Sequence, residues 1–298
     1  MRGAVAGIGI VVFAVAAFWF LTEPERVAAG QLAGGAPDLD NGRTVFFAGG
    51  CASCHATPDQ PDRMLLGGGL SIASPVGRFV APNISPDPQH GIGSWSQEDF
   101  ATALLKGTSP DGRHYYPAFP YTAYRHMRPA DVRDLFAFIK TLPSSDNAST
   151  GHGFPLDLAL VRRGVGLWKR LNLRLPADTF ASAQEPLARG RYLVEALGHC
   201  AECHSPRGVT GAVVEDRRYA GGKLADGDMA PNITPGRGGI GDWTEEDLAF
   251  FLQDGTTPDG DVTGGDMSEV IANTSQLPEA DRRAIAAYLK GLPASDSD

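Results

Sequence analysis

The chain has 298 residues, of which 42% are hydrophobic and 20% charged, and its formal net charge is -9. The length suits about two small domains, and the composition is that of a globular protein. The negative charge argues against nucleic acid as a partner and favours docking to a basic patch on another protein. With 37 glycines and 22 prolines, the domains are expected to be loop-rich.

The first predicted element is an apolar helix. Residues 4–21 carry no charge, whereas Arg2 precedes them and Glu23 and Glu25 follow. A helix of that length nearly spans a bilayer. We therefore predict an N-terminal transmembrane helix within residues 1–29, which anchors the chain in a bacterial inner membrane with its N-terminus in the cytoplasm and the rest in the periplasm. The alternative is a cleaved signal peptide, which would deliver the chain to the same side.

Cysteine occurs four times, in two runs of identical spacing followed by histidine: residues 51–55 (CASCH) and 200–204 (CAECH). Two such thiols can each form a thioether to a porphyrin vinyl group, and the histidine can then bind the iron. We therefore predict two covalently bound haem c groups, with attachment through Cys51, Cys54, Cys200 and Cys203 and with His55 and His204 as iron ligands. The alternatives are a zinc site shared by both pairs, a redox dithiol or disulfides, none of which needs the histidine.

The sequence repeats itself at an offset of roughly 149 residues, the separation of Cys51 and Cys200. Segments 81–86, 91–95 and 107–112 return as 230–235, 239–243 and 255–260. Acidic residues after Trp95 and Trp243 indicate helix starts, and helices are expected at 131–142 and 281–292, each followed by proline. We predict a mainly α fold of two tandem class I cytochrome c-like domains, residues 38–145 and 184–298, joined by a linker at 146–183.

Each iron needs a sixth ligand, and methionine sulfur is the usual choice in an electron carrier. In the second half Met267 is expected in a glycine-rich loop that could approach the haem face, whereas Met229 would lie nearer the haem edge. We predict Met267 there. In the first half we predict Met127, just before the final helix, with His126 and Met64 as alternatives.

The linker contains an expected amphipathic helix. One face carries the apolar residues Leu158, Val161, Val165 and Trp168, and four cations lie away from it: Arg162, Arg163, Lys169 and Arg170. The simplest interpretation is a helix packed on both domains with a solvated basic side. The alternatives are that the cations pair with haem propionates or with anionic lipid headgroups.

Together these motifs resemble a known family. The double haem motif, the Pro-Asn-Ile-Ser/Thr-Pro and Gly-Ile-Gly-x-Trp segments and the Tyr-Pro-Ala-Phe-Pro-Tyr run at 116–121 look like the membrane-bound multihaem cytochrome c subunits of bacterial periplasmic alcohol and gluconate-type dehydrogenases. The resemblance covers roughly residues 38–145 and 184–295. Many such subunits carry three haem motifs, whereas this chain carries two, and Phe119 stands where some members have methionine. The resemblance implies an electron-transfer subunit that serves a dehydrogenase.

Two functions follow as hypotheses. The first is a non-catalytic dihaem cytochrome that relays electrons from a periplasmic dehydrogenase or respiratory complex to quinone, another cytochrome or a terminal oxidase. The second is a dihaem enzyme of the peroxidase or thiosulfate-oxidising type, which needs one iron with an open sixth position. No paired acid and base or nucleophile in the sequence requires an enzyme, so the electron carrier is favoured.

Overall fold

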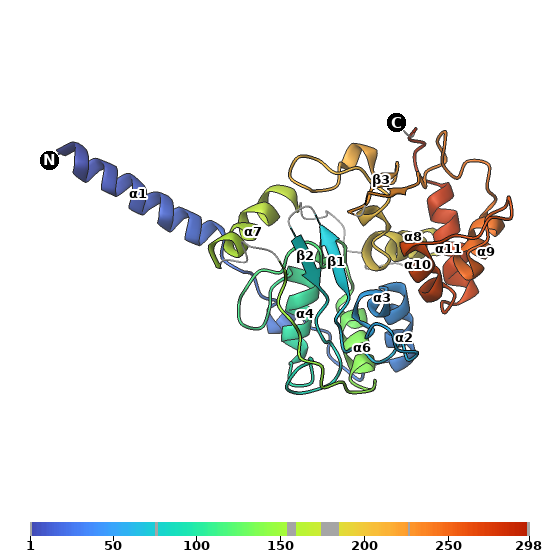
Figure 1. Cartoon of the computed structure of the whole chain (residues 1–298), viewed down its shortest axis with the longest axis horizontal. Coiled ribbons are helices and arrows are strands. Elements are labelled where there is room, and N and C mark those ends of the chain that lie inside the picture. The colour runs from blue at the N-terminus through green and yellow to red at the C-terminus, as the bar shows by residue number, and fades with distance from the viewer. Residues whose placement is uncertain (1, 75–76, 154–158, 174–184, 226, 297–298) are drawn as a thin grey trace.

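The computed structural model describes residues 2–74, 77–153, 159–173, 185–225 and 227–296, and it is mainly helical as predicted. Two halves lie side by side, and a helical rod projects from the first (Figure 1). The rod is α1 (Arg2–Leu21). The first half contains η1 (Ala29–Gln31), α2 (Leu39–Ala48), α3 (Cys51–His55), β1 (Ser71–Ser74), β2 (Gly77–Val80), α4 (Gln97–Lys106), α5 (Tyr121–Tyr124) and α6 (Pro129–Ile139).

After α7 (Ala159–Asn172), the second half contains α8 (Pro186–Tyr192), η2 (Leu193–Leu197), η3 (Cys200–Glu202), η4 (Glu215–Arg217), β3 (Gly222–Lys223), β4 (Met229–Ala230), α9 (Glu245–Asp254), α10 (Asp266–Thr274) and α11 (Glu279–Lys290). Each half therefore runs from a helix through the haem motif and a loop with a short antiparallel hairpin to further helices. The hairpins were not expected from the sequence. The junction placed at residues 183 and 184 lies outside the described residues.

In each half the first helix crosses the last at a glycine. A β-carbon on Gly42 of α2 would collide with the carbonyl of Asp134 in α6, and one on Gly190 of α8 would collide with that of Ala284 in α11. Gly42 and Gly190, which occupy equivalent positions in the repeat, are therefore contact points between two helices. Through this close crossing α2 packs against α6 in the first half, and α8 packs against α11 in the second.

The helix starts predicted after Trp95 and Trp243 are confirmed. Ser96 caps α4 by accepting a hydrogen bond from the amide of Asp99, and Thr244 caps α9 through the amide of Asp247 in the same way. The final helices α6 and α11 each begin two residues earlier than expected, with Pro129 in the first turn of α6.

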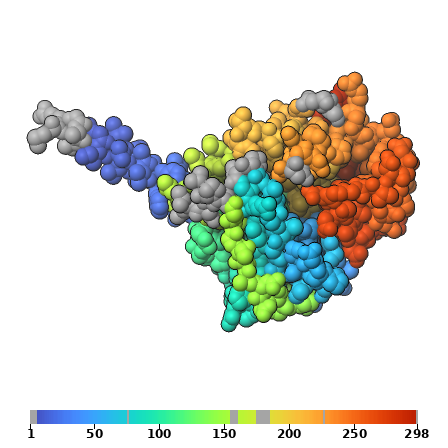
Figure 2. All heavy atoms as spheres, viewed as in Figure 1, coloured from blue at the N-terminus to red at the C-terminus, as the bar shows by residue number. Residues whose placement is uncertain are grey.

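Helix α1 extends away from the body with its apolar side chains exposed, including Phe13 at 75% and Phe20 at 72% (Figures 1 and 2). Within the part of the chain that the structure describes, no helix combines the length and the hydropathy needed to cross a membrane. For that reason the structure does not support the predicted transmembrane helix.

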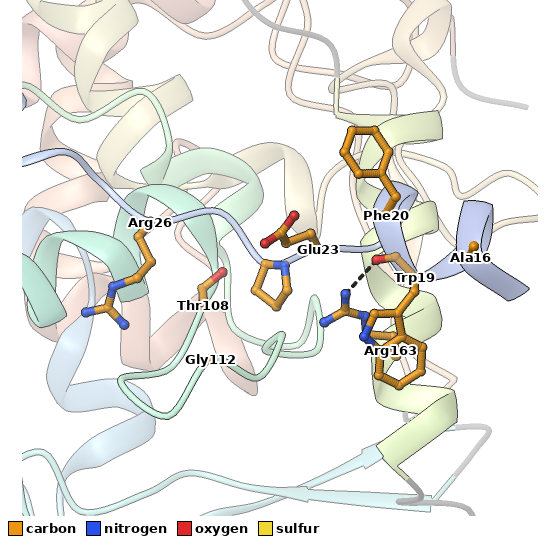
Figure 3. A pocket seen from close by; sticks show the side chains of 9 residues that line it. Ala16, Trp19, Phe20, Glu23, Arg26, Thr108, Gly112 and Arg163 are labelled. Atoms are coloured by element: carbon orange, nitrogen blue, oxygen red, sulfur yellow. Dashed lines mark hydrogen bonds between the residues drawn. The ribbon is translucent and has the colours of Figure 1, made fainter.

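Helix α7 forms hydrogen bonds with the C-terminal end of α1. The Arg163 guanidinium donates to the Trp19 carbonyl at 2.6 Å and to Thr22 Oγ1 at 3.0 Å, and Arg170 donates to the carbonyl of Leu21. The last carbonyls of a helix have no partner within it, so these two cations satisfy the C-terminus of α1. An open pocket of about 590 Å³ lies beside this junction, and Trp19, Phe20 and Arg163 line it (Figure 3). None of the predicted haem-binding residues is among its lining residues.

The rest of α7 contacts both halves. Lys169 donates to the carbonyls of Lys106 and Gly107, each at 2.7 Å, and Trp168 Nε1 donates to the carbonyl of Thr210 in the second half at 2.8 Å. The linker helix therefore packs on both halves, and its cations contact backbone carbonyls of α1 and the first half. Parts of the expected linker, residues 154–158 and 174–183, lie outside the described residues.

We predict that Gly166→Ala destabilises the protein. A β-carbon there would lie 2.7 Å from His114 Nε2 and 2.9 Å from Thr22 Cα, whereas one on Gly164 of the same helix would meet nothing within 4 Å. Urea unfolding should show a loss of about 1–3 kcal/mol for Gly166→Ala. The control Gly164→Ala should gain up to about 1 kcal/mol, because alanine is the better helix former. Equal effects of the two substitutions would show that α7 does not pack closely on this junction.

His114 makes the same junction sensitive to pH. It is 3% exposed, its Nε2 lies 2.9 Å from the Thr22 carbonyl, and burial lowers the pKa of its ring to about 4. Between about pH 6.5 and 4 the unfolded chain binds a proton that the folded chain does not, so stability falls as the pH falls. From pH 7 to pH 5 wild type should lose about 2 kcal/mol more unfolding free energy than His114→Gln. Parallel losses in both proteins would contradict this.

Candidate haem-binding site

The first pair of thiols lies at the start of α3. Gly50 adopts a left-handed conformation, with φ of 62°, which turns the chain from α2 into α3. Burial raises the pKa of the Cys51 thiol to about 12, and burial together with the nearby Asp266 raises the pKa of Cys54. A reactive dithiol needs a lowered pKa, so these thiols do not fit a disulfide oxidoreductase.

Disulfides and a shared zinc site lack support too. None of the four cysteines, all of which lie in the described residues, is joined to another by a disulfide bond. Among the described residues, no three histidine, cysteine, aspartate or glutamate side chains gather as a metal-ion site would require. Each cysteine pair instead keeps its own histidine beside it, as haem attachment requires.

The two motif histidines are oriented in the same way. His55 Nδ1 lies 2.8 Å from the carbonyl oxygen of Pro82, and His204 Nδ1 lies 2.8 Å from that of Pro231, in each case 27 residues further along the chain. Because a carbonyl can only accept, Nδ1 carries the proton and Nε2 keeps its lone pair. Burial also lowers the pKa of both rings, which favours the neutral form that binds a metal. The geometry therefore provides one imidazole nitrogen per half for an iron.

The proline carbonyls are functional groups that the sequence alone did not identify. The repeated Pro-Asn-Ile segments were the available signal. The side-chain amide of Asn83 donates to the Ser145 carbonyl at 2.8 Å, and that of Asn232 donates to the Ser295 carbonyl at 2.6 Å. Each asparagine thus fastens its segment to the end of its own half, so that the preceding proline is held against the histidine.

Met127 lies in the first-half core. It is 5% exposed and belongs to the buried cluster that includes Phe46 and Tyr124, against which Cys51 packs. Met64, the second sulfur considered for this iron, is partly buried and packs against the same cluster. For His126, the histidine considered there, burial lowers the pKa of the ring to about 4.

In the second half Met267 is partly buried and packs against the core, as does Cys200, whereas Met229 on β4 is 69% exposed. The expectation that Met267 lies in a glycine-rich loop is wrong. It lies in the first turn of α10, because the glycines end at Gly265 and the chain becomes helical at Asp266. Phe119, which the repeat aligns with Met267, packs with aromatic residues instead, among them Tyr115 and Tyr124.

Two buried polar groups near the second motif fit a haem carboxylate. Arg218 Nε and Tyr219 Oη are buried atoms, and Nη1 of the same guanidinium pairs with Glu215 at 3.2 Å. The Arg218 carbon Cζ lies 5.2 Å from the centre of the Tyr219 ring, and both side chains are close enough to Cys200 to interact with it electrostatically. A guanidinium pairs well with a propionate. Thiols, a histidine with a free Nε2, a methionine packed against the core and this pair together fit haem c.

The two attachment segments lie close to each other. Cys203 is near enough to help raise the pKa of Cys54. Helix α10 of the second half contacts both α2 and α3 of the first, and Figure 2 shows the red-orange surface of this region against the blue surface of the first half. The two haem sites therefore share one interface.

Comparison with known proteins supports this chemistry. The family described as Cytochrome c matches residues 39–143. A protein of Cereibacter sphaeroides named diheme cytochrome c-type is 47% identical over 301 residues, which cover 98% of this chain and 99% of the relative.

Two further relatives are dehydrogenase subunits. The fructose dehydrogenase cytochrome subunit of Gluconobacter japonicus is 36% identical, with 92% of this chain and 55% of the relative covered. The alcohol dehydrogenase (quinone) cytochrome c subunit of Gluconobacter oxydans is 35% identical, with 86% and 55% covered. This chain thus spans about half the length of these subunits. The resemblance inferred from the motifs is confirmed: the chain belongs to the cytochrome c family, among its dihaem c-type members, and carries two covalently bound haem c groups.

Proposed function

We propose that this cytochrome is an electron-transfer subunit that accepts electrons from a periplasmic dehydrogenase and passes them to a respiratory acceptor, either quinone, another cytochrome or a terminal oxidase. The observation that carries the proposal is that the chain aligns over 92% of its length with a dehydrogenase cytochrome subunit. The net charge of -9 suits docking to a basic patch on such a partner.

We further propose that residues 38–145 and 184–298 are two cytochrome c domains with closed, six-coordinate irons. His55 and Met127 would be the axial ligands in the first domain, and His204 and Met267 in the second. The matched bonds from His55 to Pro82 and from His204 to Pro231 support equivalent sites. A methionine bound to each iron would fill the position that a peroxidase needs open, which would favour the electron carrier over a dihaem enzyme.

We also propose that the haem domains lie in the bacterial periplasm, at the inner membrane. Thioether attachment to such motifs takes place on that side. The exposed apolar side chains of α1 support contact with an apolar phase. Protease treatment of spheroplasts should then cleave the haem domains, and protection from protease until the cells are lysed would contradict this location.

Replacing a ligand methionine should change one haem only. In Met127→Leu or Met267→Leu the oxidised protein should lose one of two methionine-to-iron charge-transfer bands. The potential of that haem should fall by on the order of 0.1 V, since a methionine ligand raises it. Absorption spectra and a redox titration measure both effects.

Each half offers a matched control. Met64→Leu for the first domain and Met229→Leu for the second should leave both bands and both potentials unchanged. If Met64→Leu removes a band and Met127→Leu does not, the first ligand is Met64 and the assignment is wrong.

The partner can be tested in membranes. After ethanol, gluconate or fructose is added to membranes that contain the cytochrome, its haem should become reduced, and a tagged full-length chain solubilised in detergent should bring dehydrogenase activity with it. Membranes from a strain without the cytochrome give the background. No haem reduction and no co-purified dehydrogenase activity would contradict the proposed donor.

A further inference from the structure

His199 occupies an unusual backbone position directly before the second haem motif. Its φ is 41°, in the left-handed region, whereas the corresponding position before the first motif is Gly50 with φ of 62°. Only Asp59 and Tyr219 share this feature among the other non-glycine residues that the structure describes. Glycine would adopt this conformation more easily, so the backbone turn alone does not account for a histidine.

The His199 side chain reaches into the first half. Its ring packs edge-on against Tyr124, with centroids 5.7 Å apart and an angle of 75° between the planes. Its Nε2 lies 3.9 Å from the point that a β-carbon on Gly50 would occupy. The backbone of Gly49, whose carbonyl accepts a hydrogen bond from the Tyr124 hydroxyl at 2.6 Å, lies close enough to the ring to affect its pKa. His199 thus connects the residue before Cys200 to the residues before Cys51.

Further bonds cross between the halves around this contact. The side-chain amide of Asn273 donates to Ser53 Oγ, inside the first motif, at 2.6 Å. Thr122 of the first half donates to Glu202, inside the second motif, at 2.5 Å. These bonds hold the two motifs in one interface. Within it, His199 directly precedes Cys200, and its ring approaches Gly50, which directly precedes Cys51.

We propose that His199 is a positioning residue that fixes the distance and orientation between the two haem-attachment segments, and through them the rate at which one electron passes from the reduced haem of one half to the oxidised haem of the other. The transfer consumes nothing else, because one iron is oxidised as the other is reduced. Electron tunnelling slows steeply as two centres move apart or turn, so a loosened contact lowers this rate. The proposal deepens the electron-relay function and rests on it.

The test uses the full-length holoprotein, oxidised or half-reduced, without any dehydrogenase. In His199→Gly the ring is absent and the left-handed backbone is retained. The variant should keep two haems and both methionine bands, but electron exchange between the haems after flash photoreduction should be several-fold slower. In His199→Asn a side-chain donor remains in a residue that tolerates this backbone, so its rate should lie between those of His199→Gly and wild type.

Asp59→Gly is the matched control, because it also removes a left-handed non-glycine residue, on an exposed turn of the first half. Its exchange rate should equal that of wild type. An unchanged rate in His199→Gly overturns the proposal. If that variant loads only one haem, His199→Asn decides: a rate below wild type supports the proposal and an unchanged rate overturns it. Since no dehydrogenase is present, failure here is distinct from failure of the membrane experiment, which tests the donor.

Discussion

The hydrogen bond from each motif histidine to a proline carbonyl is the interaction on which the rest of the structure depends. It assigns the proton to Nδ1, leaves Nε2 for iron, and sets the plane of the ring, at 2.8 Å in both halves. A carbonyl can do this only if its segment is held still, and the asparagine after each proline does so by bonding to the end of its own half. Residues far apart in sequence therefore act together to orient one imidazole.

The second constraint is the interface between the halves. Two electron-transfer sites on separate, freely moving domains would exchange electrons only during chance encounters. Here the halves are bonded through the motifs themselves and through further pairs such as Arg63 and Glu269, whose charged atoms are 2.8 Å apart. The buried hydroxyl of Tyr192 also donates to Asp131 of the first half at 2.5 Å. The arrangement of the two haem sites is therefore a property of the fold.

Much of this could be predicted from the sequence, because local chemistry determines it. The spacing of Cys51, Cys54 and His55 predicted haem attachment, and the acids after Trp95 and Trp243 predicted capped helices. The proline carbonyls could not be predicted, since a backbone oxygen has no residue type that marks it. Met267 was expected in a loop because glycines precede it, but the helix starts as soon as they end. The role of His199 depends on a contact with Gly49 and Tyr124 in the other half, which no local pattern contains.

We expect one haem in each half, with its iron bound on both faces by side chains of this chain. The most direct measurement is the electron paramagnetic resonance spectrum of the oxidised protein, integrated against its iron content. Two low-spin ferric haems of equal intensity should together represent all the iron. A high-spin signal from either haem, or iron for only one haem per chain, would contradict it.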